Sequence, residues 1–487
     1  MDHCYIDQLP PEILSHIFKL ASFIDPRISL VVSWVSQHWR RVALSTHLLW
    51  DTITILNPNM ISEYINRNPT CLITFTAVCR SSKSTVSSDC LSLFVTRRLQ
   101  PRLQNICISV IHDDVEEDVE LDQKILGMLF SPVSQRYQQL RSLSIGYALN
   151  YVTNPTANDG LPVFIEAPEL RDLRLRGLVV NSENRAIRYP LLQTFSIINT
   201  YLDRPIHTLL QGMPGLECLS LILMERYGPE DAIETPIDLS TPGGGLVLNN
   251  LRELRILRPV EGQIHDIDRL LACLNAPNLK HFEWEVNYYP RVTSLSFWER
   301  CASQFHTLTS LHLMGFTTEF PAGTIVSQML LGWLESLQHL ESFTLICSRS
   351  CLYNQIEVEL GVVTVLEHLA KTRGDDPMCC THLRSLSIGP ILPRELLYVQ
   401  SVVQARPRLR TGTLRVVQYV DTKRSAGDAS WLQANVSDFA LETVSGHGRG
   451  FRYGFRYRYV GGALRKYSNM FTECIYLDQA EQNEPFI

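Results

Sequence analysis

The sequence lacks any apolar run that approaches the ~20 residues of a membrane-spanning helix. It also lacks a strong excess of one charge, because 44 Lys and Arg residues stand against 50 Asp and Glu residues, a formal net charge of -6. Such a balance predicts no overall attraction to nucleic acid or to an anionic membrane. The first residues, MDHCYIDQLP, contain no basic or apolar leader, and the last residues match no lipid-attachment signal. We therefore expect neither a signal peptide nor a membrane anchor.

Regularly spaced cysteines are missing as well. The 13 cysteines are odd in number and scattered from Cys4 to Cys474, whereas secreted disulfide frameworks are short and dense with even numbers of cysteines. We expect reduced thiols and a cytoplasmic or nuclear location. The pairs Cys347/Cys351 and Cys379/Cys380 lack the C-x-x-C spacing of a metal site, which favours core or loop thiols.

Motifs of common enzymes are absent too. The sequence contains no H-E-x-x-H, no G-x-S-x-G and no G-x-G-x-x-G after a strand. The glycines that follow Ser240 lack the Lys-Ser/Thr of a phosphate-binding loop. We therefore expect no catalytic residues, no cofactor and no metal, and hence a protein that is not an enzyme.

Amphipathic helices dominate the first 55 residues. Pro10 and Pro11 suit the start of a helix, and the apolar residues of LPPEILSHIFKLA then recur at helical spacing. Asp25-Pro26 ends this helix, and one further helix is predicted over 28–45, before a short strand-like segment at 46–55.

This small bundle has more apolar surface than it can bury by itself. An exposed apolar patch of that size usually marks a binding partner. Packing against the next domain explains the same side chains equally well, and periodicity alone leaves both readings open.

The segment 6–55 resembles the F-box. The matching elements, in order, are LPPEIL at 9–14, Ile17-Phe18, VSQHWRRVA at 35–43 and Leu48-Leu49-Trp50, with Ser36 where the family often has Cys. The resemblance implies an F-box domain at 1–55 that binds the adaptor of SCF-type cullin–RING ubiquitin ligases and, through it, the cullin. The adaptor-binding residues implied by the matching positions are Leu9, Pro10, Ile13, Leu14, Ile17, Leu30, Trp39 and Trp50.

A second pattern, L-x-x-[LIF]-x-[LIW], recurs ten times after residue 100. The units are Leu103/Ile106/Ile108, Leu140/Leu143/Ile145, Leu170/Leu173/Leu175, Leu192/Phe195/Ile197, Leu216/Leu219/Leu221, Leu251/Leu254/Ile256, Leu279/Phe282/Trp284, Leu308/Leu311/Leu313, Leu340/Phe343/Leu345 and Leu383/Leu386/Ile388. The first leucines of successive units are 22 (Leu170 to Leu192) to 43 (Leu340 to Leu383) residues apart. The shorter separations fall within leucine-rich-repeat spacing, and the longer ones require insertions.

The last positions of each unit alternate, which predicts a short strand with two side chains pointing inward. Prolines at 168, 190, 214 and 277 precede several units and predict a turn into the strand. Helical spacing between strands, as in IDRLLACL and VSQMLLGWLESL, completes a strand–helix repeat whose neighbours must stack to bury a core.

The predicted fold is therefore α/β: a small helical F-box domain followed by a leucine-rich-repeat-like solenoid, with parallel strands on the concave face and helices outside. We expect a linker or cap at 56–100, the solenoid at 101–417 and a C-terminal cap at 418–487. The irregular layout resembles F-box proteins expanded in mushroom-forming fungi. An ordinary α/β domain with buried parallel strands is the alternative.

Side chains between the inward positions of each strand face the concave side and are candidates for substrate binding. They are Asp172, Arg174, Arg176, Glu253, Arg255, His281, Glu283, Glu285 and His312, with Ser310 beside them. The alternative for each is a charge that only solvates the sheet.

Three functions fit these patterns. The first is a substrate receptor that presents an unidentified protein to the ligase, and the second is a scaffold that uses the same adaptor for its own stability. The third is a nucleic-acid-binding solenoid, because arginines alternate with aromatic residues at 446–467. The same alternation gives a capping strand, which we favour, so a nucleic-acid partner is not expected.

Overall fold

The fold was analysed in a computed structural model, which describes residues 6, 9–22, 24–25, 27–54, 57–80, 99–111, 137–147, 166–177, 179–180, 188–198, 201–202, 206–222, 245–257, 267, 270–285, 301–317, 325–348, 361–373, 376–420 and 429–445. The chain divides into two compact units. The described part of the first unit lies within 1–194 and 198–204, and that of the second lies within 195–197 and 205–462. Within these residues, no helix combines the length and the apolar character that crossing a membrane requires.

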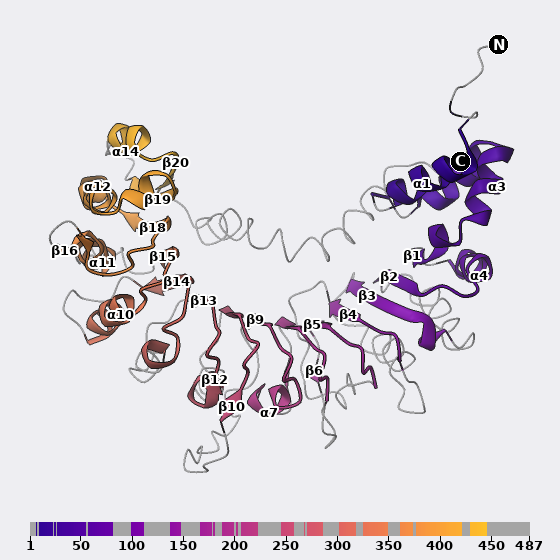
Figure 1. The fold of residues 1–487 in the computed structure, drawn as a ribbon, viewed down its shortest axis with the longest axis horizontal. Coiled ribbons are helices and arrows are strands. Elements are labelled where there is room, and N and C mark those ends of the chain that lie inside the picture. The colour runs from indigo at the N-terminus through magenta and orange to yellow at the C-terminus, as the bar shows by residue number, and fades with distance from the viewer. Residues whose placement is uncertain are drawn as a thin grey trace. The chain divides into compact units, whose positions relative to one another are not determined.

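The first unit combines a helical N-terminal part with parallel strands (Figure 1). Its elements are α1 (Pro11–Ser22), α2 (Ile28–Val35), α3 (Gln37–Ser45), η2 (His47–Trp50), β1 (Thr52–Ile53), α4 (Pro58–Arg67), β2 (Ile73–Arg80), η4 (Gln100–Arg102), β3 (Leu103–Ile111), β4 (Ser142–Tyr147), β5 (Asp172–Arg176), β6 (Val179–Val180) and β8 (Tyr201–Leu202).

The single helix predicted over 28–45 is wrong, because the chain breaks it at Ser36. This residue is extended, with φ -153° and ψ 165°, and its side-chain oxygen accepts a hydrogen bond from the backbone N–H of Trp39 at 3.1 Å. Ser36 therefore caps the start of α3, a role for which serine is strongly preferred. Helical periodicity alone misses the break, because the apolar positions of α2 and α3 continue one another.

A parallel sheet follows the helices in the first unit. Its order is β1-β2-β3-β4-β5, and the neighbouring strands pair in parallel. Ile106 pairs with Leu143, which pairs with Leu173, so equivalent positions of successive units are in register. Because β1 belongs to the helical part and pairs with β2, the sheet begins before residue 101, where the sequence placed the first repeat.

The second unit continues the strand–turn pattern and adds helices. Its elements are β7 (Thr194–Ile198), α7 (Ile206–Leu210), β9 (Cys218–Ile222), β10 (Leu246–Val247), β11 (Glu253–Leu257), β12 (Leu274–Asn275), β13 (His281–Glu285), β14 (Ser310–Thr317), α10 (Ile325–Ser336), β15 (Ser342–Ser348), α11 (Gly361–Ala370), β16 (Thr372–Arg373), β17 (Asp376–Pro377), β18 (Ser385–Ile391), η7 (Pro393–Glu395), α12 (Leu396–Ala405), α13 (Pro407–Arg410), β19 (Thr413–Val420), α14 (Ser430–Asn435) and β20 (Asp438–Ser445).

The main sheet of the second unit is parallel throughout, in the order β9-β11-β13-β14-β15-β18-β19-β20. All three positions of each of the ten sequence units are buried, none with more than 4% of its surface exposed. The predicted strands and their inward faces are thus confirmed. The sheet also extends past residue 417, because β20 pairs along its length with β19.

A hydrogen-bonded turn precedes most of these strands. In the four proline-led turns the N–H of the first leucine donates to the carbonyl three residues earlier: Leu170 to Ala167, Leu192 to Tyr189, Leu216 to Met213 and Leu279 to Ala276. Proline suits the second position of such a turn because its φ is already set. The next N–H then joins the neighbouring strand, as Lys280 does with Arg252 at 2.8 Å.

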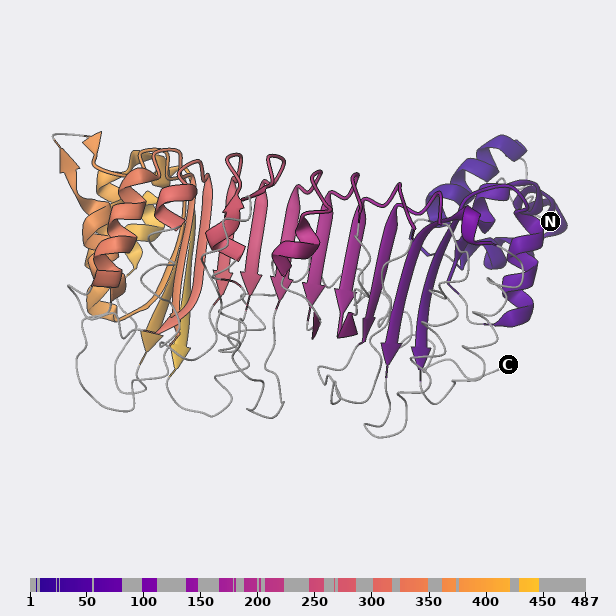
Figure 2. The same ribbon diagram turned by 90° about the horizontal axis from the view of Figure 1, so that it is seen from below.

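Helices cover one face of the sheet in the second unit. Figures 1 and 2 show α10, α11 and α12 on the same side of strands β14 to β19. Their buried side chains, such as Trp333, Leu366 and Val402, fill the core between helix and strand. The opposite face presents the polar side chains that alternate with the buried positions.

Candidate functional site

The first candidate surface lies on the N-terminal helices. Backbone N–H groups of Ile13 and Leu14 donate to the carbonyl of Pro10 at 3.0 and 3.1 Å, so the proline-rich start opens α1 directly. Leu14 and Phe18 point into the core, with 0% and 1% exposed. One turn of helix thus separates the buried positions, which leaves Ile13 and Ile17 on the outer side.

Aromatic packing holds the three helices together. The rings of Phe18 and Trp39 lie 5.0 Å apart, which joins α1 to α3. Trp50 is fully buried, and its indole N–H donates to the carbonyl of Ala43 at 3.0 Å. A buried Trp of this kind needs such a partner for its polar atom.

Helix α4 completes this core, in a segment where the sequence predicted only a linker or cap. The Tyr64 ring contacts Trp50 at 5.0 Å, and its hydroxyl lies 2.7 Å from the Ser29 hydroxyl on α2. The guanidinium of Arg67 stands 4.2 Å from the Trp50 ring centroid. Helix α4 therefore buries part of the apolar surface that the N-terminal helices cannot bury by themselves.

A substantial apolar surface nevertheless stays exposed on these helices. On α1, Ile13, Ile17 and Leu20 are 49%, 40% and 53% exposed and fall on one helical face. The α2 helix exposes Val31, Trp34 and Val35, and Trp34 is 71% exposed. Further exposed apolar side chains are Ile6, Ile24, Leu44 and Leu48. We call the α1 and α2 residues the apolar strips.

The eight residues implied for adaptor binding divide into three groups. Pro10, Ile13 and Ile17 are exposed, while Leu9, Leu30 and Trp39 are half-buried. Leu14 and Trp50 are fully buried, so they support the helices from inside and present no surface in this conformation. The exposed Val31, Trp34, Val35 and Leu48 were absent from that prediction, although Trp34 stood out as a large apolar residue in a short helix.

Residues 6–56 match the family model described as F-box-like. This segment is an F-box-like domain. The match covers α1 to β1, the part of the chain that carries the apolar strips. No curated protein matches the chain significantly. The family finding thus supports an F-box protein at the N-terminus, and the match ends before β2.

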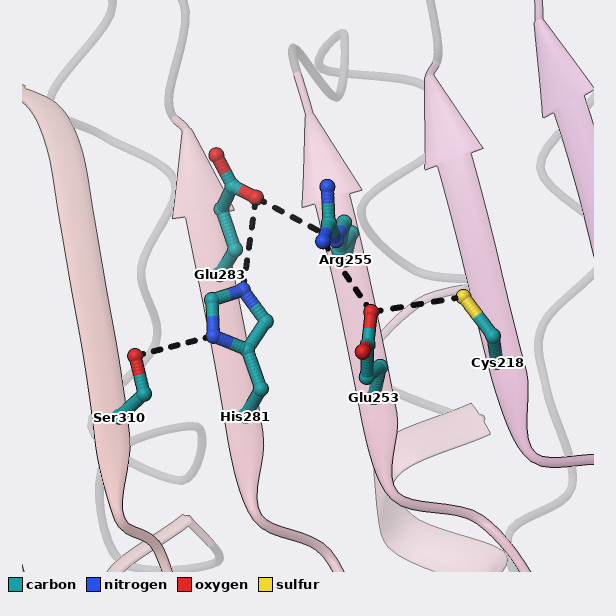
Figure 3. Close-up of polar contacts among 6 residues, drawn as sticks. All are labelled: Cys218, Glu253, Arg255, His281, Glu283 and Ser310. Carbon is teal, nitrogen blue, oxygen red and sulfur yellow. Dashed lines mark hydrogen bonds and ion pairs between the residues drawn. The ribbon is translucent and has the colours of Figure 1, made fainter. Parts of the chain in front are cut away.

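Beyond the F-box-like domain, a polar cluster crosses four neighbouring strands of the second unit (Figure 3). Glu253 Oε2 lies 3.1 Å from Arg255 Nη2 and 3.8 Å from the thiol of Cys218. Arg255 Nε lies 3.6 Å from Glu283 Oε2, which is also 3.6 Å from His281 Nε2. His281 Nδ1 completes the chain of contacts at 3.0 Å from Ser310 Oγ.

Register explains why these side chains meet. Glu253 pairs across the sheet with Cys218 and His281, and Arg255 pairs with Glu283. Cys218 was not among the predicted residues, although it occupies the same position of its unit as Glu253 does. Counting positions from the first leucine of each unit would have identified it.

Burial and charge tune the titration of this cluster. Burial acts to raise the pKa of Glu283, but its interaction with His281 and the nearby cations outweigh burial and lower the pKa. His312 contacts the His281 ring at 4.9 Å, and burial together with the charge of His281 lowers the pKa of His312 to about 4. The cluster therefore holds an ionised Glu283 carboxylate beside a neutral His312 imidazole at neutral pH.

The remaining predicted substrate-binding residues lie apart from this cluster. In the first unit, Arg174 Nη2 pairs with Asp172 Oδ2 at 3.1 Å, and Arg176 is half-buried, which lowers its pKa. Glu285 is buried at the end of β13. The structure thus brings Glu253, Arg255, His281, Glu283 and His312 together and places Asp172 and Arg174 in a separate pair. The Arg-aromatic segment 446–467 lies outside the described residues.

Proposed function

We propose that the chain is the substrate-recognition subunit of an SCF-type cullin–RING ubiquitin ligase. F-box-like domains generally bind the adaptor of such ligases, and one occupies residues 6–56 here. The observation that supports the assignment best is the apolar strips, because a soluble domain rarely exposes a side chain such as Trp34 at 71% without a partner. On this proposal the adaptor covers the strips and links the chain to the cullin.

The parallel sheet then acts as the substrate-binding part, a leucine-rich-repeat-like solenoid built from in-register strand units. Ten units with buried inward positions support this assignment, because each unit buries its core only against its neighbours. The chain itself supplies no catalytic group on this proposal. It holds the substrate near the ubiquitin-charged enzyme and raises the effective concentration of the reacting lysine. We place it in the cytoplasm or nucleus.

The first test targets the apolar strips. Ile13→Asp combined with Ile17→Asp adds two charges to an exposed helical face without touching the core. We expect the affinity for purified adaptor, measured by calorimetry, to fall by roughly 30-fold or more, the effect of losing a central contact. Leu397→Asp on α12, at a residue that is 66% exposed, is the matched control and should bind as the wild type does. Absence of binding by the wild-type chain would refute the proposal.

The second test targets the polar cluster. Glu253→Lys reverses a carboxylate whose side chain is 43% exposed, while Glu442→Lys on β20 reverses a half-buried carboxylate elsewhere on the sheet. Proteins captured by each variant together with the adaptor are compared by quantitative mass spectrometry. The substrate role of the cluster predicts that Glu253→Lys loses a defined set of proteins that Glu442→Lys retains. Identical captured sets would remove the cluster from the proposal.

A further inference from the structure

Two adjacent cysteines lie between β17 and β18 in the second unit. Cys379 and Cys380 follow β17 and are both 0% exposed. Cys380 accepts the turn hydrogen bond from Leu383 at 3.1 Å, so it occupies the position that Ala167 and Met213 hold in other units. Its φ of 47° lies in the left-handed region, which a side chain with a Cβ seldom adopts. The backbone here is thus held by its surroundings.

A buried arginine provides that hold. Arg406, with 2% of its surface exposed, donates from Nη1 to the carbonyls of Cys379 and Cys380 at 2.7 and 2.9 Å. Its Nε donates to the carbonyl of Leu369 at 2.9 Å. These neutral oxygens satisfy the donors of the guanidinium but do not neutralise its charge, and a buried charge needs a compensating partner.

The sulfur of Cys379 is placed to supply the negative charge. It lies 3.5 Å from Arg406 Nη2, and burial separates the two groups from water. Interaction with the thiol of Cys380 lowers the pKa of Cys379 most, burial opposes this, and His368 and the charge of Arg406 lower it further. The same interaction, together with burial, raises the pKa of Cys380, whose Sγ donates to the carbonyl of Leu334 at 3.3 Å. The contact with Arg406 thus favours the thiolate form of Cys379, and the hydrogen bond to Leu334 favours the thiol form of Cys380.

We propose that Cys379 and Cys380 form a redox-reactive dithiol that a peroxide converts reversibly into a disulfide between the two neighbours. The Cys379 thiolate attacks one peroxide oxygen, so that an S–O bond forms and the O–O bond breaks. The released hydroxide takes a proton to become water. The sulfur of Cys380 then attacks the sulfenic sulfur, the S–S bond forms, and the departing hydroxide takes the Cys380 proton. Two thiols and one hydrogen peroxide give one disulfide and two waters.

Geometry makes such a disulfide labile. Neighbouring Cα atoms are about 3.8 Å apart across a trans peptide, which is shorter than the span of most disulfides. Strained disulfides are reduced more easily than structural ones. Oxidation also removes the anion beside Arg406 and leaves a buried cation without compensation, which destabilises the packing of α11 against α12. Reduction restores the original contacts.

Access to the pair requires only a small movement. Met378, the residue before the pair, is 49% exposed, so the chain reaches the surface directly beside the buried thiols. Hydrogen peroxide is small enough to reach them during local opening of the segment. We therefore expect slower oxidation than at an exposed thiol, but about tenfold faster oxidation than at a buried cysteine without a neighbouring cation, because the thiolate is the reactive form.

The test exposes the full chain to hydrogen peroxide at neutral pH and maps cysteine states by differential alkylation and mass spectrometry. We expect a disulfide within the Cys379–Cys380 peptide, with a mass lower by two hydrogens, and its loss on treatment with a dithiol reductant. In Cys380→Ser the intermediate should accumulate as a sulfenic acid at Cys379, trapped by a dimedone probe. In Cys379→Ser no adduct should form at Cys380. Cys301→Ser, at a buried cysteine of the same unit, is the matched control and should oxidise as the wild type does.

Three results would overturn the proposal. They are oxidation of both cysteines only after unfolding, a dimedone adduct on Cys380 in place of Cys379, and a disulfide from either cysteine to a distant one. Hydrogen exchange gives a second readout that needs no variant. Oxidation should increase amide exchange in α11, which contains Leu369, and in α12, which ends directly before Arg406, and leave the F-box-like domain unchanged.

Discussion

At the scale of single residues, burial decides how the charged side chains of the polar cluster behave. Glu283 and Arg255 compensate each other at 3.6 Å, and the carboxylate stays ionised. Glu283 also stabilises the charged form of His312, but burial and the charge of His281 outweigh this effect, and the low pKa keeps His312 neutral in the folded protein. The same strand positions that were predicted to bind a partner thus also determine how the fold responds to acid.

The lowered pKa of His312 predicts how the stability of the fold changes with pH. The pKa of His312 falls from about 6.5 to about 4 on folding, so the unfolded chain binds a proton that the folded chain does not. Stability is unaffected above pH 6.5 and falls as the pH drops toward 4. Between pH 7 and pH 5 we expect His312 to account for a loss of about 2 kcal/mol.

Urea unfolding at the two pH values, for wild type and His312→Gln, checks this prediction. Between pH 7 and pH 5 the variant should lose about 2 kcal/mol less stability than the wild type, because the glutamine amide does not titrate. Equal losses in both proteins would show that His312 is not the responsible group. Glu283 does not obscure the comparison, since a lowered carboxyl pKa affects stability only below its unfolded value of about 4.5.

At the scale of elements, turns and helix ends hold the strands in place. The turn between α13 and β19 contains Gly412, where a Cβ would stand 1.8 Å from the carbonyl oxygen of Arg384. This oxygen accepts the hydrogen bond from Thr413 that starts the pairing of β19 with β18. The close approach of two backbones therefore requires glycine.

Two single-methyl substitutions test this requirement. Gly412→Ala should destabilise the protein by roughly 1 to 3 kcal/mol, because backbone has to move. Gly332→Ala in the middle of α10 meets no atom within 4 Å and should stabilise it by about 0.5 to 1 kcal/mol through helix propensity. Chemical denaturation of both variants gives the comparison. A neutral Gly412→Ala would mean that the β18–β19 contact is looser than the structure indicates.

Elements were also where sequence reasoning succeeded and failed. Inward positions such as Leu254 and Phe282 were predictable, because strand alternation and a repeated leucine fix the buried side. Ser36 and α4 were not, since a cap interrupts helices without changing their period, and α4 is recognised only once Tyr64 meets Trp50. The contact of Arg255 with Glu283 depends on strand register. The sequence pattern predicts that register only when the units are aligned by their first leucines.

At the scale of the whole molecule, the chain forms two compact units that each have a core. Leu386 in β18 and Leu173 in β5 are both 0% exposed and occupy the same position of their units. Leu386→Ala should cost the second unit about 2 to 5 kcal/mol, as large cavities do. On the proposed repeat architecture, stability is a sum of local terms, so the loss should stay near the substitution.

Hydrogen exchange locates the damage. Leu386→Ala should accelerate exchange in β15 and β19, which pair with β18, with little change in α1 to α3. Leu173→Ala, the matched substitution, should accelerate exchange in the first unit and change it little in β15 and β19. Equal acceleration in both units by either variant would show that the chain unfolds as a single cooperative body.

The repeating turn has a consequence for how such a chain changes over generations. In most units the N–H of the first leucine closes a turn, and the following N–H re-establishes pairing with the strand before it. An insertion between two strands is therefore corrected at the next turn and does not shift the alignment of later strands. Connections can lengthen, shorten or acquire new sequences while the ladder stays intact, so this architecture can diversify what it displays without being rebuilt.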